Sequence, residues 1–331
     1  MNCRTQASHG LLAMMVCALL LSGCSGVQSA LEPAGREAER IASLFWWMAG
    51  GAMVIWLGVI GLAVYSMRRA QSYSPRAARF YIIGGGAALP VVVLAVLLAY
   101  GLAMVPELVA TAPPGSLKVV VSGEQWWWRV EYESPGGSVP LANEIHLIAG
   151  EPVQFELVSP DVIHSFWIPS LGGKVDMIPG RRNRLALHPT KAGLYRGACA
   201  EYCGASHALM NFYVVVEEKQ EFAQWLQRQA QPALPPVDPL AVRGGELFLS
   251  NGCGACHTIR GTPAAGVVGP DLTHVGSRAS LAAGILPNEP DAFLRWIAHV
   301  KEIKPEARMP EFAMLPQDDL RAIAAYLNGL Q

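Results

Sequence analysis

Hydrophobic side chains along this sequence first gather in two long, uncharged runs. Residues 42–66 contain no charged side chain, and residues 80–106 contain none either. Each run is longer than the about 20 residues that an α-helix needs to cross a bilayer. The segment between them, residues 67–79, holds four arginines and no acidic residue. Because arginine-rich loops stay on the cytoplasmic side, the pattern predicts a membrane hairpin whose two flanks both lie outside the cytoplasm.

A shorter apolar run begins the chain. Arg4 precedes an apolar core at residues 11–21, which is the pattern of an export signal peptide. The core ends in Leu-Ser-Gly-Cys, which resembles the bacterial lipobox, so residues 1–23 are predicted to be removed and Cys24 to carry a lipid. An ordinary signal peptide with a chance cysteine is the alternative. Either way, the N-terminal segment and both spans fall in residues 24–109, and we expect a bacterial inner membrane with the following domains in the periplasm.

From residue 116 to residue 218 the hydrophobic positions form short alternating runs. Runs such as LKVVVSG, VQFELVS and NFYVVVEE are separated by turn sequences such as Pro-Gly-Gly at 135–137. Several short strands at this spacing are typical of an all-β sandwich or barrel. About 100 residues suffice for one hydrophobic core. The pattern therefore predicts one β domain outside the membrane.

The last part of the chain changes pattern again. Residues 219–240 are expected to act as a linker, because their second half, QAQPALPPVDPL, is rich in proline and semi-rigid. Residues 241–331 then show helical runs, among them AVRGGELFLSNG and PQDDLRAIAAYLNGL. The chain thus predicts a second outer domain, which is all-α.

Composition narrows the function. The chain is 52% hydrophobic and 15% charged, with a formal net charge of −1, which argues against a nucleic-acid partner. Four of its seven cysteines form two close pairs, Cys199 with Cys203 and Cys253 with Cys256. Histidines stand beside both pairs, so the pairs indicate metal or haem sites more than a disulfide framework. We expect structural roles for the other histidines of the two outer domains: His146, His188, His274 and His299.

The first cysteine pair lies in the segment CAEYCGASHALM, residues 199–210, and a further histidine, His164, lies after a distant strand. Thiolate, thioether and imidazole ligands together favour copper. Three kinds of site remain open. A closed zinc tetrahedron would use both cysteines with His164 and His207, leaving Met210 unexplained. A mononuclear blue-copper site would leave one cysteine spare, whereas a binuclear copper site would use both as bridges.

The second pair forms the motif C-x-x-C-H, which attaches c-type haem. Cys253 and Cys256 would form thioethers to the porphyrin, and His257 would bind the iron. A thioredoxin-like dithiol is the alternative. A methionine well downstream would complete the coordination of the iron as its second axial ligand. Met309 and Met314 are the only methionines after Met210.

These motifs resemble a known family. The segment CAEYCGASHALM, the run DVIHSFWIPSLGGKVDMIPGR around His164 and the motif GEQWWW at 123–128 resemble the CuA-containing subunit II of cytochrome c oxidase over roughly residues 40–218. Residues 240–331 resemble a class I cytochrome c, and the fusion resembles the caa3 type. The resemblance implies a two-helix transmembrane hairpin, an all-β cupredoxin domain at 116–218 and an all-α cytochrome c domain.

The resemblance also implies a copper ligand set. Cys199 and Cys203 would bridge two copper ions, His164 and His207 would be terminal ligands, and Met210 would be a weak one. Glu201 would offer its backbone carbonyl to copper and its carboxylate to a magnesium ion shared with the large subunit. Trp126 would be an exposed aromatic at which electrons enter, although residues 126–128 could equally form a strand with core packing.

For the haem domain, the resemblance implies that Met309 binds the iron and that Met314 is a packing residue. The carbonyl of Pro270 would orient His257. The helices that carry Gly244 and Tyr326 would cross.

The function implied is electron transfer. Electrons from cytochrome c, or from a quinol–cytochrome c reductase, would pass through haem c to CuA and then to the large subunit I, which reduces oxygen to water. Fusion would make the encounter between haem domain and copper intramolecular. Two alternatives stay open: the CuA-bearing subunit of a nitric oxide reductase, and a membrane-anchored copper delivery protein.

Overall fold

The structure is a computed structural model that describes residues 25–68, 74–134 and 137–331. The predicted signal peptide and the lipid site at Cys24 lie outside these residues. The chain divides into two compact units, one formed by residues 40–111 and the other by the remaining residues. Each unit is described by itself.

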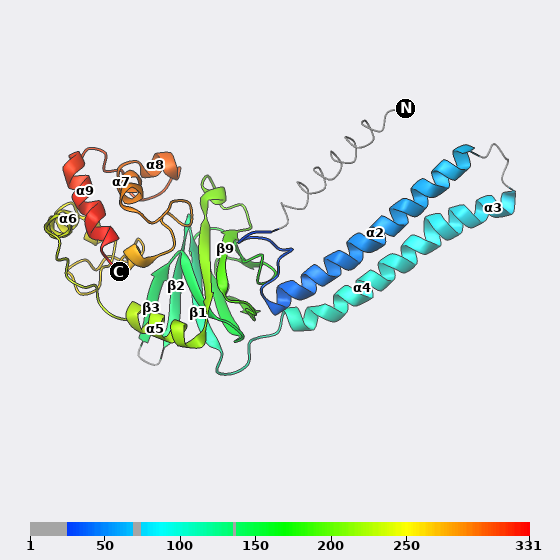
Figure 1. The fold of residues 1–331 in the computed structure, drawn as a ribbon, viewed down its shortest axis with the longest axis horizontal. Helices are drawn as coiled ribbons and strands as arrows, with labels where there is room; N and C mark the ends of the chain where they lie inside the picture. Colours follow the sequence, from blue (N-terminus) through cyan, green and yellow to red (C-terminus); the bar gives the residue numbers. More distant parts are fainter. Residues whose placement is uncertain (1–24, 69–73, 135–136) are drawn as a thin grey trace, which may run out of the picture. The chain divides into compact units, whose positions relative to one another are not determined.

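The unit 40–111 is helical. The helix α2 (Arg36–Arg68) continues into it, and a second helical stretch consists of α3 (Pro75–Arg79), the π-helical η2 (Phe80–Ala88) and α4 (Leu89–Leu108) (Figure 1). Both stretches are long and apolar enough to cross a membrane. Most of their large apolar side chains are exposed. Pro90 lies where the π-helical η2 continues into α4. Arg40 and Glu107 form an ion pair within this unit.

The β domain is a sandwich of two five-stranded sheets. Their strand orders are β3-β2-β1-β5-β8 and β4-β10-β9-β6-β7, with parallel pairing between β1 and β5 and between β4 and β10. The strands are β1 (Leu117–Glu124), β2 (Trp127–Ser134), β3 (Gly137–Ala142), β4 (Glu144–Ile148), β5 (Val153–Val158), β6 (His164–Trp167), β7 (Val175–Met177), β8 (Asn183–Leu187), β9 (Gly193–Cys199) and β10 (Asn211–Glu217). The expected all-β cupredoxin-like sandwich is confirmed.

Aromatic side chains fill the space between the two sheets. Trp128 on β2 is fully buried, and its ring lies edge-on to Phe166 and Phe212, with centroids 5.7 and 5.1 Å away. Gly197 on β9 leaves room for this cluster, because a Cβ there would lie 2.1 Å from the ring of Phe212. The core therefore fixes β9 and β10 against each other, and the loop between these two strands carries the first candidate site.

Residues 219–229 do not behave as a linker. They form the helix α5 (Lys219–Gln229), which begins with a capping box between Glu218 and Glu221. Phe222 and Trp225, three residues apart on one face, are buried against the β domain. The expected linker is therefore extended only in its proline-rich second half, because these two aromatic side chains stabilise a helix in the first half.

The C-terminal domain is helical and has its own core. It consists of α6 (Pro239–Ser250), η4 (Cys253–Ala255), η5 (Val275–Ser277), α7 (Pro290–Ala298), α8 (Val300–Ile303) and α9 (Gln317–Asn328) (Figure 1). The expected crossing of α6 and α9 is confirmed at Gly244, where a Cβ would lie 1.9 Å from the carbonyl oxygen of Ala322. Only glycine allows this close approach.

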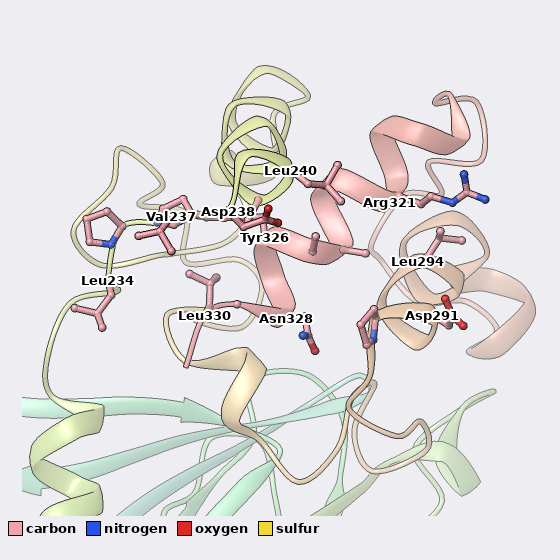
Figure 2. A pocket seen from close by; sticks show the side chains of 17 residues that line it. Leu234, Val237, Asp238, Leu240, Asp291, Leu294, Arg321, Tyr326, Asn328 and Leu330 are labelled. Atoms are coloured by element: carbon pink, nitrogen blue, oxygen red, sulfur yellow. The ribbon is translucent and has the colours of Figure 1, made fainter.

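A pocket of about 740 Å³ lies between the proline-rich segment, α7 and α9. Figure 2 shows Leu234 and Val237 from that segment beside Tyr326 and Leu330 at the end of the chain. None of its lining residues is a predicted metal or haem ligand, so the candidate sites lie elsewhere.

Candidate metal and haem centres

The strands β6 and β9 and the loop that follows β9 bring the predicted copper ligands together. Cys199 ends β9, and its N–H donates to the carbonyl of Met210, which closes the base of the 199–210 loop (2.9 Å). His207 lies in a single turn of 3₁₀ helix, η3 (His207–Leu209). His164 begins β6, which pairs with β9 so that Phe166 faces Cys199. Strand pairing therefore places a histidine from 35 positions earlier beside the loop.

The six predicted donor groups lie in a chain of short contacts. The two sulfurs of Cys199 and Cys203 are 3.8 Å apart and are not joined in a disulfide. Nδ1 of His164 lies 3.8 Å from the Cys199 sulfur, and Nδ1 of His207 lies 3.5 Å from the Cys203 sulfur. The structure also brings the other two donors to the pair. The Glu201 carbonyl oxygen is 3.2 Å from the Cys199 sulfur, and the Met210 sulfur is 3.9 Å from the Cys203 sulfur.

This arrangement favours two metal positions over one. Donor atoms of His164, Cys199 and Cys203 all lie within 4.8 Å of one another, and His207 falls outside that group. A single tetrahedral ion would need all four donors around one point. Instead, each sulfur has its own imidazole, with the two sulfurs between them. Soft donors in this order suit a pair of copper ions bridged by both thiolates.

Asp161, which the sequence analysis did not identify, contacts His164 on the side of the imidazole away from Cys199. Its Oδ1 lies 2.9 Å from Nε2 of His164, and its Oδ2 accepts the N–H of Gln125 at 2.8 Å. Burial alone would raise the pKa of Asp161, but the Gln125 N–H and the His164 imidazole together lower it. An Nε2–H donated to this carboxylate leaves the Nδ1 lone pair facing Cys199. Carboxylates commonly fix metal-binding histidines in this way.

The two loop thiols titrate as a pair. A hydrogen bond with Cys203 lowers the pKa of Cys199, and the same contact raises the pKa of Cys203. Without a metal, the pair therefore shares one proton. A soft cation would displace that proton, since thiolates are the ligands that metals bind.

Trp126 is not the exposed aromatic that was expected. Its side chain is 5% exposed, and its indole N–H donates to the carbonyl of Cys203 at 3.0 Å. The side-chain amide of Gln125 donates to the same oxygen at 2.8 Å. Gly204, at φ +116°, gives the ring its place, because a Cβ there would lie 2.9 Å from it. Trp126 therefore braces the backbone of Cys203, a predicted copper ligand.

The haem-attachment segment has the expected form. Cys253 is partly buried and begins the 3₁₀ turn η4, and Cys256 is exposed and follows that turn, directly before His257. Nδ1 of His257 lies 2.8 Å from the carbonyl oxygen of Pro270, as the resemblance implied. A Cβ at Gly269 would lie 2.6 Å from the imidazole. Burial lowers the pKa of His257, so the ring is neutral and its Nε2 lone pair is free to bind iron.

The two downstream methionines differ in their surroundings. Met309 is half-buried and packs against the core of the helical domain. Met314 is 77% exposed, so the expectation that it is a packing residue is wrong. The loop 310–316 leaves Met314 outside because Phe312 and Leu315 take the inward positions. Burial therefore favours Met309 as the iron ligand.

Comparisons with known proteins match both outer domains. Residues 136–218 match the family described as "Cytochrome C oxidase subunit II, periplasmic domain", and residues 241–331 match the cytochrome c family. Cytochrome c oxidase subunit 2 of Alkalihalophilus pseudofirmus is 32% identical over 332 residues, which cover 95% of this chain and 94% of the relative. The chain belongs to the cytochrome c oxidase subunit 2 family.

Further relatives of this subunit 2 extend the likeness. Cytochrome c oxidase subunit 2 of Bacillus subtilis is 29% identical, and the alignment covers 97% of each chain. A crystal structure of the periplasmic domain of subunit II from Bradyrhizobium japonicum is 30% identical, with a TM-score of 0.34, and covers 36% of this chain and 96% of that one.

Membership fixes the coarse function of this subunit 2. It is an electron-transfer subunit of a haem–copper oxidase, an oxidoreductase complex, and its matched β domain is periplasmic. The family implies a copper centre in the β domain and a haem in the helical domain. The donor sets described above fit both groups: soft ligands converge at the loop, and a neutral, oriented histidine follows the two free thiols.

Proposed function

We propose that this subunit 2 passes electrons from a haem c bound at Cys253, Cys256 and His257 to a binuclear copper centre at the 199–210 loop. Met309 is the second iron ligand. From copper, electrons continue to the large subunit I, which reduces oxygen to water. The observation that carries the proposal is the order of contacts from His164 through Cys199 and Cys203 to His207, each at 3.5–3.8 Å.

The copper pair would supply a one-electron relay. The residues of this chain would hold the copper ligands in place and exclude water from them. Cys203 is 3% exposed and Met210 is fully buried, so water is kept from the sulfur ligands. Asp161 fixes one imidazole, and Trp126 with Gln125 fixes the carbonyl of Cys203. Ligands that are held before the electron arrives need little movement when the charge changes.

Finer features belong to the same proposal. The helices α2 and α4 would anchor the subunit in a bacterial inner membrane beside the large subunit, with a lipid at Cys24. Cytochrome c or a quinol–cytochrome c reductase would supply electrons, and Trp126 would lie on their route. Glu201 would give its carbonyl to copper. Its carboxylate lies 3.5 Å from Lys174, so a magnesium ion there needs further ligands from the large subunit to compete with that ammonium.

The test is purification of the chain in mild detergent with whatever binds it. We expect a large haem-bearing subunit to copurify, together with oxygen uptake driven by reduced cytochrome c. Recovery of the chain alone, or consumption of nitric oxide without oxygen uptake, would contradict the proposal.

A further inference from the structure

A buried histidine lies between two carboxylates at the end of β10 that is farther from the 199–210 loop. His146 on β4 is 7% exposed. Its Nε2 lies 3.1 Å from a carboxylate oxygen of Glu144, and its Nδ1 lies 2.8 Å from one of Glu217, the last residue of β10. A neutral imidazole has one N–H and can donate to only one carboxylate, whereas a protonated one donates to both. The geometry therefore fits the protonated form of His146.

A tryptophan of α5 stacks on the same imidazole. The ring centroids of Trp225 and His146 are 3.7 Å apart, and the two planes differ by 9°. A cation that lies over the face of an indole is attracted to it. Trp225 is one of the residues that bury α5 against the β domain. A proton on His146 therefore strengthens the packing of α5 as well as the two hydrogen bonds. We call His146, Glu144, Glu217 and Trp225 the His146 cluster.

Two further titratable groups face this cluster. The hydroxyl of Tyr132 on β2 accepts the N–H of His146 at 2.6 Å and donates to the carbonyl of His146 at 3.0 Å. Burial raises the pKa of Tyr132, so its phenol stays neutral. The guanidinium of Arg278, from the helical domain, acts on Glu144 by its positive charge. His146 is therefore the group of the cluster whose charge changes near neutral pH.

The two carboxylates differ in what else holds them. Glu144 is 5% exposed and also accepts the N–H of Ala279 at 2.6 Å. The side chain of Glu217 is 17% exposed. When His146 is neutral, one carboxylate loses its donor, and an unpaired buried carboxylate is unfavourable. Glu217 can turn toward water, and α5 begins only two residues after it, at Lys219. Loss of the proton therefore disturbs both the start of α5 and its stacking contact.

The direction of the pH dependence follows from the surroundings of His146. Burial would lower the pKa of His146, but hydrogen bonds to Glu144 and Glu217 raise it above the usual value of 6.5. A pKa that folding raises gives a stabilisation that is complete below the unfolded value and disappears as the pH rises through the folded one. The cluster is therefore intact at low pH and loses its charge above pH 6.5.

The other end of α5 is bound to the helical domain. Arg260 donates to the carbonyl of Gln229 at 2.6 Å, and Nε2 of His274 lies 3.0 Å from the carbonyl oxygen of Gln231. While Trp225 is held on the β domain, the link between the two outer domains is therefore the last turn of α5. If α5 were released, the link would begin at Glu218 instead, and the two domains would be joined by a longer free segment.

We propose that the His146 cluster is a pH-sensitive clamp, which holds α5 on the β domain while His146 is protonated and releases α5 when that proton is lost to the outer solvent. The clamp sets the length of the free link between the β domain and the helical domain. It goes beyond the proposed function, because it does not depend on the route that electrons take.

Hydrogen exchange of the α5 backbone in the complete oxidase measures the clamp. Each rate is divided by the intrinsic exchange rate at the same pH, which gives a protection factor. We expect the protection of residues 219–229 to fall about tenfold or more between about pH 6 and pH 9. Residues 205–214 are an internal control, because the hydroxyl of Ser206 donates to the carbonyl of Pro305 at 2.6 Å and this contact includes no member of the His146 cluster. Their protection should stay constant.

Three variants separate the clamp from a general loss of stability. His146→Gln cannot carry the charge, so α5 should be weakly protected to the same extent at both pH values. His299→Gln, at a histidine whose side chain is 48% exposed, is the matched control and should behave like the parent. Glu217→Gln leaves His146 one charged partner and should move the fall in protection to lower pH, which also tests the clamp if His146→Gln does not fold.

Two results would overturn the clamp. One is protection of α5 that does not change with pH in the parent, or that falls in the same way in His146→Gln or at the same pH in Glu217→Gln. The other is an equal fall at residues 205–214, which would indicate unfolding of the whole outer region.

Discussion

Asp161 and His164 form a fixed pair, with Oδ1 of the carboxylate 2.9 Å from Nε2 of the imidazole and Nδ1 of the same ring turned toward Cys199. The carboxylate therefore sets the tautomer and direction of His164, a proposed copper ligand. We predict that Asp161→Asn weakens copper binding by about 10- to 100-fold, the usual effect of losing such a partner. Competition with a chelator measures it. Asp318→Asn, at an exposed carboxylate of α9, is the matched control and should retain copper like the parent. If both variants retained copper equally well, Asp161 would have no part in positioning the copper ligand His164.

The two downstream methionines give a second prediction. Replacing half-buried Met309 with leucine should lower the midpoint potential of the haem, because methionine ligation raises it. Redox titration of the haem measures the change. The same replacement at exposed Met314 should leave the potential unchanged. A fall in potential with Met314→Leu, and none with Met309→Leu, would reverse the assignment.

His146 gives a prediction about pH. It is buried between the carboxylates of Glu144 and Glu217, at 3.1 and 2.8 Å, and stacks on Trp225. Burial alone would lower the pKa of His146, but hydrogen bonds to the two carboxylates outweigh burial and raise it. A pKa raised by folding stabilises the fold fully below the unfolded value of about 6.5, and this stabilisation disappears as the pH rises through the folded pKa.

We therefore expect His146→Gln to destabilise the β domain most at low pH, by about 1–3 kcal/mol, with a difference that shrinks as the pH rises. Calorimetry of the parent and the variant between about pH 5.5 and 9 measures it. His299→Gln, at a histidine whose side chain is 48% exposed, should show no such trend. If the difference in stability between parent and variant grew with pH, His146 would not be a protonated, stabilising group.

A substitution at Trp126 tests whether its buried side chain supports the backbone of Cys203. Phenylalanine would keep an aromatic ring but lose the hydrogen bond to the Cys203 carbonyl, leaving the one from Gln125. We predict a loss of copper affinity of less than tenfold, together with a changed copper spectrum. An unchanged spectrum, with slower reduction of copper as the main effect, would instead indicate that the ring serves only as an electron path.

The helices, the strands and the candidate ligands could be predicted from the sequence because each depends on the residues of one short segment. Apolar runs are enough to predict α2 and α4, and the spacing within residues 199–210 and 253–257 is enough to predict two redox groups. The sequence could not show that Asp161 binds His164, since an aspartate three residues before a histidine has many other roles. The burial of Trp126 depends on a carbonyl 77 positions away. The contact between Ser206 and Pro305 depends on two domains that no local pattern relates.

Electron paramagnetic resonance of the oxidised, purified complex, together with its metal content, tests the central claim most directly. The account predicts two copper ions per copy of this chain and a spectrum in which one unpaired electron is shared equally between them. Cys199→Ser and Cys203→Ser should each abolish that sharing, because both thiolates bridge. One zinc ion per chain, or a single Cu(II) signal that survives the loss of either cysteine, would contradict it.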